Sequence, residues 1–304
     1  MKNNLLLSQY ISTPWAVRRD VLAVHAQIIM NWANNIQNAN LEHQTNDYDA
    51  RIRDVNERIN ASYIAVIPVY GVIVQRAGII TDWCGGTSAD QLSNAVTEAA
   101  NDDSVSDIIL DIDSPGGSVY GIEMAANAIY NARSKKNIIA ISNSCCASAA
   151  YWIGSQASEF YCVPGGEVGS IGVYTVHEDV SQYYENLAVK TTFIKAGEHK
   201  TDGNSYEPLT EDAQAFMQTR INDYYEQFTS AVARGRNKTV DYVKKNMGQG
   251  RVFGTTEAIS SNMIDGIMTF SELINSKRTN QANQNAAKKL KTKSYYKSII
   301  FQNI

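Results

Sequence analysis

Several features that mark particular classes of protein are scarce in this sequence. It has only four cysteines and four histidines, with no C-x-x-C pair and no histidine at the spacing of zinc ligands. We therefore expect neither a metal ion nor a cofactor, and we expect reduced, buried thiols. The four thiols belong to Cys84, Cys145, Cys146 and Cys162.

Long apolar runs and an excess of positive charge are also missing. No run of about 20 apolar residues occurs, so we expect no transmembrane helix. The first ten residues, M-K-N-N-L-L-L-S-Q-Y, hold too short an apolar stretch for a signal peptide, which predicts a cytoplasmic protein. A net charge of −4 and a pI near 5.6 argue against nucleic-acid binding.

The chain has 304 residues, of which 44% are hydrophobic, and its composition changes twice along its length. Residues 1–60 are polar and include P-W-A-V-R-R-D-V-L-A-V-H-A-Q-I-I-M-N-W, whose apolar spacing predicts a helical arm. Residues 61–275 should form the main domain. Residues 276–304 are basic, with no acidic residue after Glu272, and predict a disordered tail that is able to dock on an acidic partner.

Strands and helices should alternate through the main domain, which predicts an α/β fold with a largely parallel sheet. I-A-V-I-P-V-Y-G-V-I-V reads as a strand pair broken by Pro68 and Gly71, and D-I-I-L-D-I-D, N-I-I-A-I-S and E-F-Y-C-V-P read as further strands. Helices should follow these strands. Ser88 is the expected N-cap of one helix and Thr210 that of a long amphipathic helix.

The stretch N-S-C-C-A-S-A-A-Y-W, residues 143–152, holds the strongest candidate nucleophile. Ser148 lies where a strand should end and a helix should begin, a position that suits attack on a substrate at the rim of a sheet. Small alanines around it leave room for a substrate. Weaker candidates are Ser142, just before this stretch, and Ser144, Cys145 and Cys146 within it, and no histidine is obviously placed to activate either cysteine.

Backbone amides near this stretch are candidates for binding an oxyanion. The glycines of D-I-D-S-P-G-G-S-V, Gly116 and Gly117, follow a strand and should present N–H groups at a helix N-terminus. The amide of Ala149 is the expected second donor. A pair of glycines is also what an ordinary tight turn requires, so these residues alone leave both readings open.

Either a histidine or a lysine could act as the base for Ser148. The histidines are His25, His43, His177 and His199, and their spacing neither supports nor excludes a Ser-His-Asp triad. A free lysine has a pKa of about 10.4, but burial can lower the pKa of a lysine to roughly 7–8. Composition alone does not select which lysine that would be.

Four motifs in this order resemble the signal peptide peptidase A family of serine proteases, most closely its phage prohead (capsid maturation) branch. They are D-S-P-G-G-S-V, C-A-S-A-A-Y-W, V-G-S-I-G-V and A-G-E-H-K-T-D-G-N-S-Y-E-P-L-T. The resemblance covers roughly residues 60–275. It implies a fold like that of Clp protease and crotonase, with repeated β-β-α units beside the helical N-terminal arm.

The resemblance also implies a role for each matching residue. Ser148 would be the nucleophile, Lys200 the general base and Ser170 the residue that orients the lysine amine. The oxyanion hole would be formed by Gly117 and Gly116 and by the amide of Ala149. The sequence departs from the family at Ala149 and Ala150, where glycines are common, and alanine keeps this space small.

The implied function is cleavage of phage scaffold, portal or coat proteins in the host cytoplasm or the procapsid, by a homo-oligomer without a membrane anchor. The arm and the tail would bind scaffold or coat protein. Alternatives are a peptidase that degrades signal or membrane peptides, a crotonase-like acyl-CoA enzyme, and a non-enzymatic assembly protein. The crotonase alternative leaves Ser148 and Lys200 unexplained.

Overall fold

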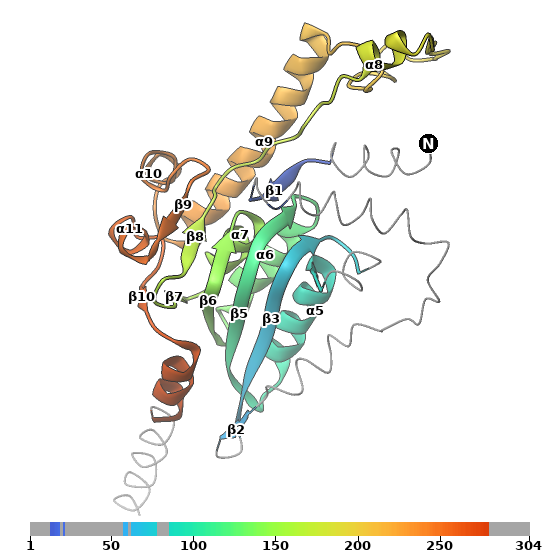
Figure 1. Cartoon of the computed structure of the whole chain (residues 1–304). Coiled ribbons are helices and arrows are strands. Elements are labelled where there is room, and N and C mark those ends of the chain that lie inside the picture. Colours follow the sequence, from blue (N-terminus) through green and yellow to red (C-terminus); the bar gives the residue numbers. More distant parts are fainter. Residues whose placement is uncertain (1–12, 19–20, 22–56, 60–61, 78–84, 280–304) are drawn as a thin grey trace, which may run out of the picture.

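A ten-stranded sheet forms the centre of the molecule (Figure 1). The computed structural model describes residues 13–18, 21, 57–59, 62–77 and 85–279. Along the sheet the order is β10 (Gly266–Ile267), β7 (Glu159–Cys162), β6 (Asn137–Ala147), β5 (Val105–Ser118), β3 (Ser62–Val74) and β2 (Glu57–Ile59). Four short strands join beside this path: β1 (Trp15–Val17), β4 (Thr87–Ser88), β8 (Glu167–Gly169) and β9 (Val252–Gly254).

Helices follow the strands in alternation, which confirms the predicted α/β class. They are α5 (Ala89–Asn101), α6 (Ile122–Ala132), α7 (Ala149–Gly154), α8 (Ser181–Asn186), α9 (Glu211–Gly235), α10 (Val240–Asn246) and α11 (Thr255–Ser260). Both expected caps are confirmed, since Ser88 accepts from the amide of Gln91 and Thr210 from that of Ala213. No helix in the described ranges is long and apolar enough to cross a membrane.

The central strands are buried on both faces because successive side chains point to opposite sides. On β5, Ile108 and Leu110 belong to the main core under the helices, whereas Ile109 lies in a second cluster on the other face. Leu273 and Ile274 contribute to that second cluster. The parallel pairing of β3, β5, β6 and β7 therefore lies between two apolar layers, as purely parallel sheets require.

Two local expectations for the strands are wrong. Pro68 and Gly71 do not break a strand pair, because β3 runs through both. Around Pro68, β3 pairs only with β5 in the described part of the chain, so a missing N–H is tolerated as it is on an edge strand. Gly71 has φ +64 and takes up the register shift between Tyr70 and Val72 as a bulge.

The expected helical arm is also wrong where the structure describes it as a strand. Trp15–Val17 forms β1, which pairs antiparallel with Gly116–Ser118 of β5. Pairing with β5 outweighs the helical spacing of the sequence here, because it gives these backbone groups partners inside the protein. Most of the rest of the arm, most of the basic tail, Cys84, His25 and His43 lie outside the described residues.

Candidate active site

Ser148 occupies a strained turn between β6 and α7. Its φ of 56° and ψ of −119° are unusual for a residue with a side chain, and such conformations cluster at functional sites. Two hydrogen bonds hold the turn: the Ser148 amide donates to the carbonyl of Gly169 (2.7 Å) and the Trp152 amide donates to the Ser148 carbonyl (2.9 Å). The expected strand-to-helix position of Ser148 is therefore present.

The hydroxyl of Ser148 is buried and has no hydrogen-bond partner among the described residues. Buried polar atoms are nearly always hydrogen-bonded, so an orphaned hydroxyl on a strained turn marks a place where another group is expected to bind. Gly116 packs directly against it, since a Cβ added to this glycine would lie 2.9 Å from the Cβ of Ser148.

Ser170 lies beside Ser148 because β6 and β8 run parallel with Ala147 opposite Gly169. Ser148 follows Ala147 and Ser170 follows Gly169, so the two serines come directly after a pair of residues that face each other across the two strands. Ser170 also has a positive φ of 56°, and its amide donates to the carbonyl of Arg251 (2.7 Å). Thus two of the expected site residues come together within one copy of the chain.

The two glycines of D-S-P-G-G-S are strand residues rather than the N-terminus of a helix, which corrects the expected nest. Both belong to β5, and α6 begins only at Ile122. The amide of Gly116 donates to Ser114 Oγ (3.2 Å), so it is already engaged. Gly117 is packed so tightly that a Cβ there would lie 1.8 Å from the Ile73 carbonyl oxygen.

The cysteines beside Ser148 are poor nucleophiles in this structure. Burial raises the pKa of Cys146 well above its usual value, and its side chain is in the core. Burial also raises the pKa of Cys145, although a hydrogen bond from Arg18 (3.7 Å) opposes this. Because the thiolate is the reactive form, neither cysteine competes well with Ser148.

Lys200 is not brought to Ser148 within one copy. It is exposed, in the segment between α8 and α9, next to His199, whose ring lies 3.7 Å from the carboxylate of Asp212 at the start of α9. Phe228, which stacks on Trp152 of α7, lies 16 residues further along α9, which is about 24 Å along the helix axis. A lysine side chain does not span that separation.

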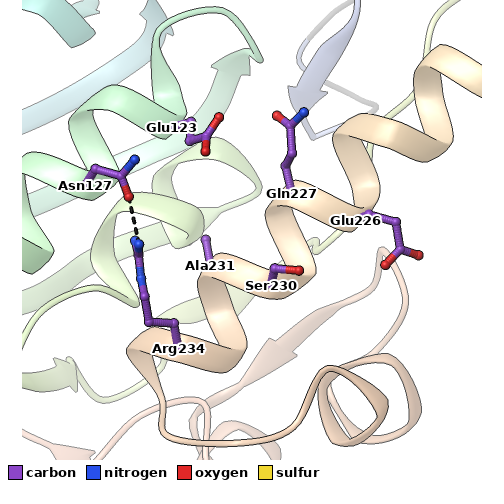
Figure 2. A pocket seen from close by; sticks show the side chains of 7 residues that line it. All are labelled: Glu123, Asn127, Glu226, Gln227, Ser230, Ala231 and Arg234. Carbon is purple, nitrogen blue, oxygen red and sulfur yellow. Dashed lines mark hydrogen bonds between the residues drawn. The ribbon is translucent and has the colours of Figure 1, made fainter.

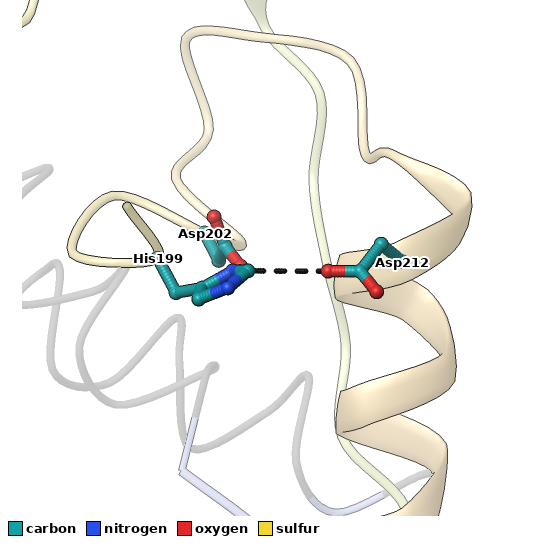
Figure 3. Close-up of side chains that lie close together, drawn as sticks. All are labelled: His199, Asp202 and Asp212. Atoms are coloured by element: carbon teal, nitrogen blue, oxygen red, sulfur yellow. Dashed lines mark hydrogen bonds and ion pairs between the residues drawn. The ribbon is translucent and has the colours of Figure 1, made fainter. Parts of the chain in front are cut away.

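The described histidines also lie away from Ser148, on the same projecting segment. His177 Nε2 is 2.9 Å from the carbonyl of Asn204, and His199 Nδ1 is 2.9 Å from Asp202. The hydrogen bond that the His199 ring donates to Asp202 and the charge of that carboxylate raise the pKa of His199. His199, Asp202 and Asp212 lie together at the surface (Figure 3), where His199 pairs with the two carboxylates.

A surface pocket of about 390 Å³ lies between α6 and α9, away from these residues. Figure 2 shows Glu123 and Asn127 of α6 on one side and Gln227 and Arg234 of α9 on the other. Arg234 donates to Asn127 (2.8 Å). No expected site residue lines this pocket, and its polar rim resembles an ordinary groove between packed helices.

The sequence did not predict that β1 lies close to Ser148. β1 passes over Gly116 and Gly117 and also forms an antiparallel bridge from Trp15 to Tyr174. The signal in the sequence was the short P-W-A-V, in which Pro, Trp and Val favour an extended chain, but the longer apolar period behind it indicated a helix.

Comparison with known proteins places the chain in a family. The model of peptidase family S49 matches residues 131–285, a range that includes Ser148, Ser170 and Lys200. The chain is 33% identical over 211 residues to head-tail preconnector protein GP5 of Enterobacteria phage P21, covering 69% of the chain and 42% of that protein. It is 31% identical over 211 residues to capsid assembly protease C of Escherichia phage lambda, covering 69% and 48%.

The chain thus spans less than half the length of either phage relative. A ClpP1 mutant from Listeria monocytogenes is similar in structure, with a TM-score of 0.42 and 15% identity over 67% of this chain and 91% of that one. The family match covers just over half of the chain and agrees with the resemblance carried by the four motifs. The chain belongs to peptidase family S49.

Proposed function

We propose that the chain is a serine endopeptidase in which Ser148 attacks the peptide carbonyl and Lys200 is the general base. The observation that carries this proposal is the buried, unpartnered hydroxyl of Ser148 on its strained turn. The neighbouring Ser170 and the backbone of Gly117 and Ala149 supply the other groups that the reaction needs. Their arrangement suits acyl transfer.

Each proton and each charge in this reaction has a group to receive it. The neutral Lys200 amine removes the Ser148 proton as Oγ bonds to the carbonyl carbon, and the carbonyl oxygen becomes an oxyanion. The amides of Gly117 and Ala149 donate to that oxyanion. The lysine ammonium then protonates the departing amine, and water hydrolyses the acyl-serine with the lysine again as base. The Ser170 hydroxyl orients the lysine amine.

The lysine of this dyad comes from a second copy of the chain, because Lys200 lies too far from Ser148 in its own copy. Residues 172–210 project from the sheet together with the N-terminal half of α9 (Figure 1). This projecting arm carries apolar side chains that are largely exposed, including Ile194 (100%) and Tyr183 (63%). Such a surface marks an interface, and a second copy completes the site.

The proposed substrates are phage head proteins, cleaved inside an immature capsid. The support is the name of the lambda relative, a capsid assembly protease, and the name of the P21 relative, a head-tail preconnector protein. Scaffold, portal and coat proteins are the substrates to test first.

Substitution and mixing experiments test the mechanism. Ser148→Ala should abolish peptidase activity and labelling by a fluorophosphonate, and Lys200→Ala should lower both by about 10²–10⁴-fold. The matched controls Ser144→Ala and Lys190→Ala, both at exposed residues, should behave as wild type. If Lys200→Ala retains the wild-type rate, the dyad is wrong.

Mixing the two inactive variants distinguishes a shared site from one within a single copy. When Ser148→Ala and Lys200→Ala chains are unfolded, mixed in equal amounts and refolded, random assembly pairs an intact serine with a neighbour's intact lysine at about a quarter of the sites. Activity should recover to that fraction. A mixture as inactive as its components would show that both residues act within one copy.

A further inference from the structure

A short strand close to Ser148 lies between two backbone edges. Residues 14–18, here called the resident strand, lie antiparallel to β5. The amide of Arg18 donates to the carbonyl of Pro115 (2.9 Å), and the amide of Val119 donates to that of Pro14 (3.3 Å). Because hydrogen-bonded pairs alternate along an antiparallel ladder, Ala16 and Gly117 between them occupy a hydrogen-bonding position.

The other edge of the resident strand is held by the segment that follows Ser170. The Trp15 amide donates to the Tyr174 carbonyl (2.9 Å), and the Tyr174 amide donates back to the Trp15 carbonyl (3.0 Å). The resident strand is therefore paired on both sides, as an extended peptide is when it adds to a sheet. One edge contains Gly117, a proposed oxyanion donor, and the other follows Ser170 in the chain.

The carbonyl of Ala16 lies close to the nucleophile. A Cβ added to Gly116 would be 2.3 Å from the Ala16 oxygen and 2.9 Å from the Ser148 Cβ, so these two atoms are no more than 5.2 Å apart. The same carbonyl faces Gly117, whose amide is a proposed oxyanion donor. The resident strand thus occupies the place and the direction of a peptide whose carbonyl is presented to Ser148.

Burial and charge hold the resident strand in this groove. Trp15 is 2% exposed, Ala16 0% and Val17 3%, and the first and last of these pack with Val72. Arg18 forms an ion pair with Glu167 (3.1 Å) on β8. A substrate cannot add to the same edges while these contacts persist.

We propose that this groove is the peptide-binding groove and that residues 14–18 of the chain block it until they are displaced. The inference rests on the proposed peptidase function. It also specifies a class of substrate: an extended segment with a small residue opposite Gly117, flanked by bulky apolar residues on the other face, as Trp15, Ala16 and Val17 are arranged.

Peptide binding without catalysis tests this inference. The probe is a fluorescent octapeptide with the sequence of residues 12–19, Ser-Thr-Pro-Trp-Ala-Val-Arg-Arg, and the protein is the full chain carrying Ser148→Ala. Adding Ala16→Arg to that chain puts a long charged side chain where none fits and expels the resident strand. Fluorescence polarisation should then show binding at least about tenfold tighter than to Ser148→Ala alone, because an occupied groove lowers apparent affinity.

Matched controls separate displacement from a general effect of added charge. Met124→Arg, at an exposed residue of α6, adds the same side chain and should leave peptide binding as weak as in Ser148→Ala. An octapeptide with arginine in place of its alanine should not bind the opened groove. Equal binding to the closed and opened chains, or no binding to either, overturns the proposal.

A second variant covers the case in which Ala16→Arg fails to fold, as circular dichroism would show. Trp15→Ser removes the largest anchor of the resident strand and should have the same effect on binding. In chains with an intact Ser148, both substitutions should speed fluorophosphonate labelling. If Ser148 never reacts with the fluorophosphonate, the peptidase proposal fails. The polarisation experiment still tests whether the resident strand blocks a peptide-binding groove, because it does not depend on catalysis.

Discussion

Ser148 and its nearest neighbours show how backbone geometry creates the candidate site. The serine adopts φ 56°, and Gly116 beside it adopts φ +102°, a region that side chains avoid. Glycine adopts a positive φ readily, but for serine this conformation is unfavourable in an isolated chain. The strands and the helix around Ser148 hold it in place, so the hydroxyl of the proposed nucleophile is fixed in position before any substrate arrives.

Gly116→Ala should therefore damage the site. The new Cβ would meet the Ala16 oxygen at 2.3 Å and the Ser148 Cβ at 2.9 Å. Overpacking together with the unfavourable φ should lower the free energy of unfolding by about 2–4 kcal/mol. Gly254→Ala is the control, because nothing lies within 4 Å of a Cβ there, and it should cost less than about 1 kcal/mol. Urea unfolding curves would compare the two, and equal midpoints would contradict the packing described here.

A second prediction at the residue scale concerns the ion pair of Arg236 and Asp265. Two nitrogens of Arg236 lie 2.7 and 3.0 Å from the carboxylate, which also accepts from the amide of Phe160 (2.8 Å). Burial alone would raise the pKa of Asp265, but these hydrogen bonds and the arginine charge outweigh it and lower the pKa. The stabilisation is therefore present above the unfolded pKa and is lost as pH falls through the folded one.

Asp265→Asn should lower the free energy of unfolding at pH 7 by about 1–3 kcal/mol, less than for a fully buried pair because water screens the half-exposed carboxylate. The difference from wild type should begin to shrink below about pH 4, where the carboxylate becomes protonated in the unfolded chain, and should be lost once the pH falls below the lowered pKa of the folded state. Asp223→Asn breaks an exposed 4.0 Å pair with Arg220 and serves as the control. Unfolding curves at several pH values would measure the difference in the free energy of unfolding between wild type and Asp265→Asn. A difference that does not change with pH would show that the ion pair does not stabilise the fold in this way.

At the scale of helices and strands, local signals in the sequence were sufficient wherever local chemistry decides the structure. Ser88 and Thr210 begin their helices because their hydroxyls accept hydrogen bonds from amides three residues ahead. The alternation of apolar strands and amphipathic helices predicted the sheet. Only the family resemblance implied that Ser148 and Ser170 share a site, and the parallel pairing of β6 with β8 brings the two serines together.

The sequence was insufficient where pairing between distant segments determines the local structure. Trp15–Val17 was expected to be helical, but its partners are Gly116–Ser118 and Tyr174, more than 95 residues away. Local periodicity carries no information about such partners. The distance between Lys200 and Ser148 within one copy likewise depends on the direction of α9, which no motif specifies.

The packing of α7 against α9 gives a prediction at this scale. Phe228 is fully buried and stacks on Trp152 at a ring separation of 4.7 Å, which fixes the helix that follows Ser148. Phe228→Ala should lower the free energy of unfolding by about 3–5 kcal/mol. Phe216→Ala, on the same helix but 65% exposed, should change it by less than about 0.5 kcal/mol in dilute solution. Thermal denaturation would compare the stability of the two variants. An equal loss of stability in both would contradict this packing.

At the scale of the whole molecule, the described part of the chain consists of a packed sheet with helices and an arm that extends away from it. The projecting arm carries Lys200, whereas the sheet carries Ser148 and the groove that the resident strand fills. Under the two proposals made above, one copy has a blocked groove and a distant base. Assembly with a second copy would supply the base, and displacement of the resident strand would open the groove, so the two steps together would restrict proteolysis to the assembled state.

Ile194→Asp tests whether the projecting arm binds a second copy of the chain. Ile194 is fully exposed and projects from the segment that carries Lys200, so a charge there should prevent burial against a neighbour without disturbing the core of its own copy. Sedimentation should show a smaller particle, and peptidase activity should fall by at least about tenfold because Lys200 no longer reaches Ser148 of another copy. The melting temperature of the single copy should be unchanged. Ile259→Asp, at a partly exposed isoleucine on α11, adds the same charge outside the arm and should keep both mass and activity. An Ile194→Asp protein of wild-type mass and activity would show that the arm contacts no second copy and that the base must reach Ser148 by another route.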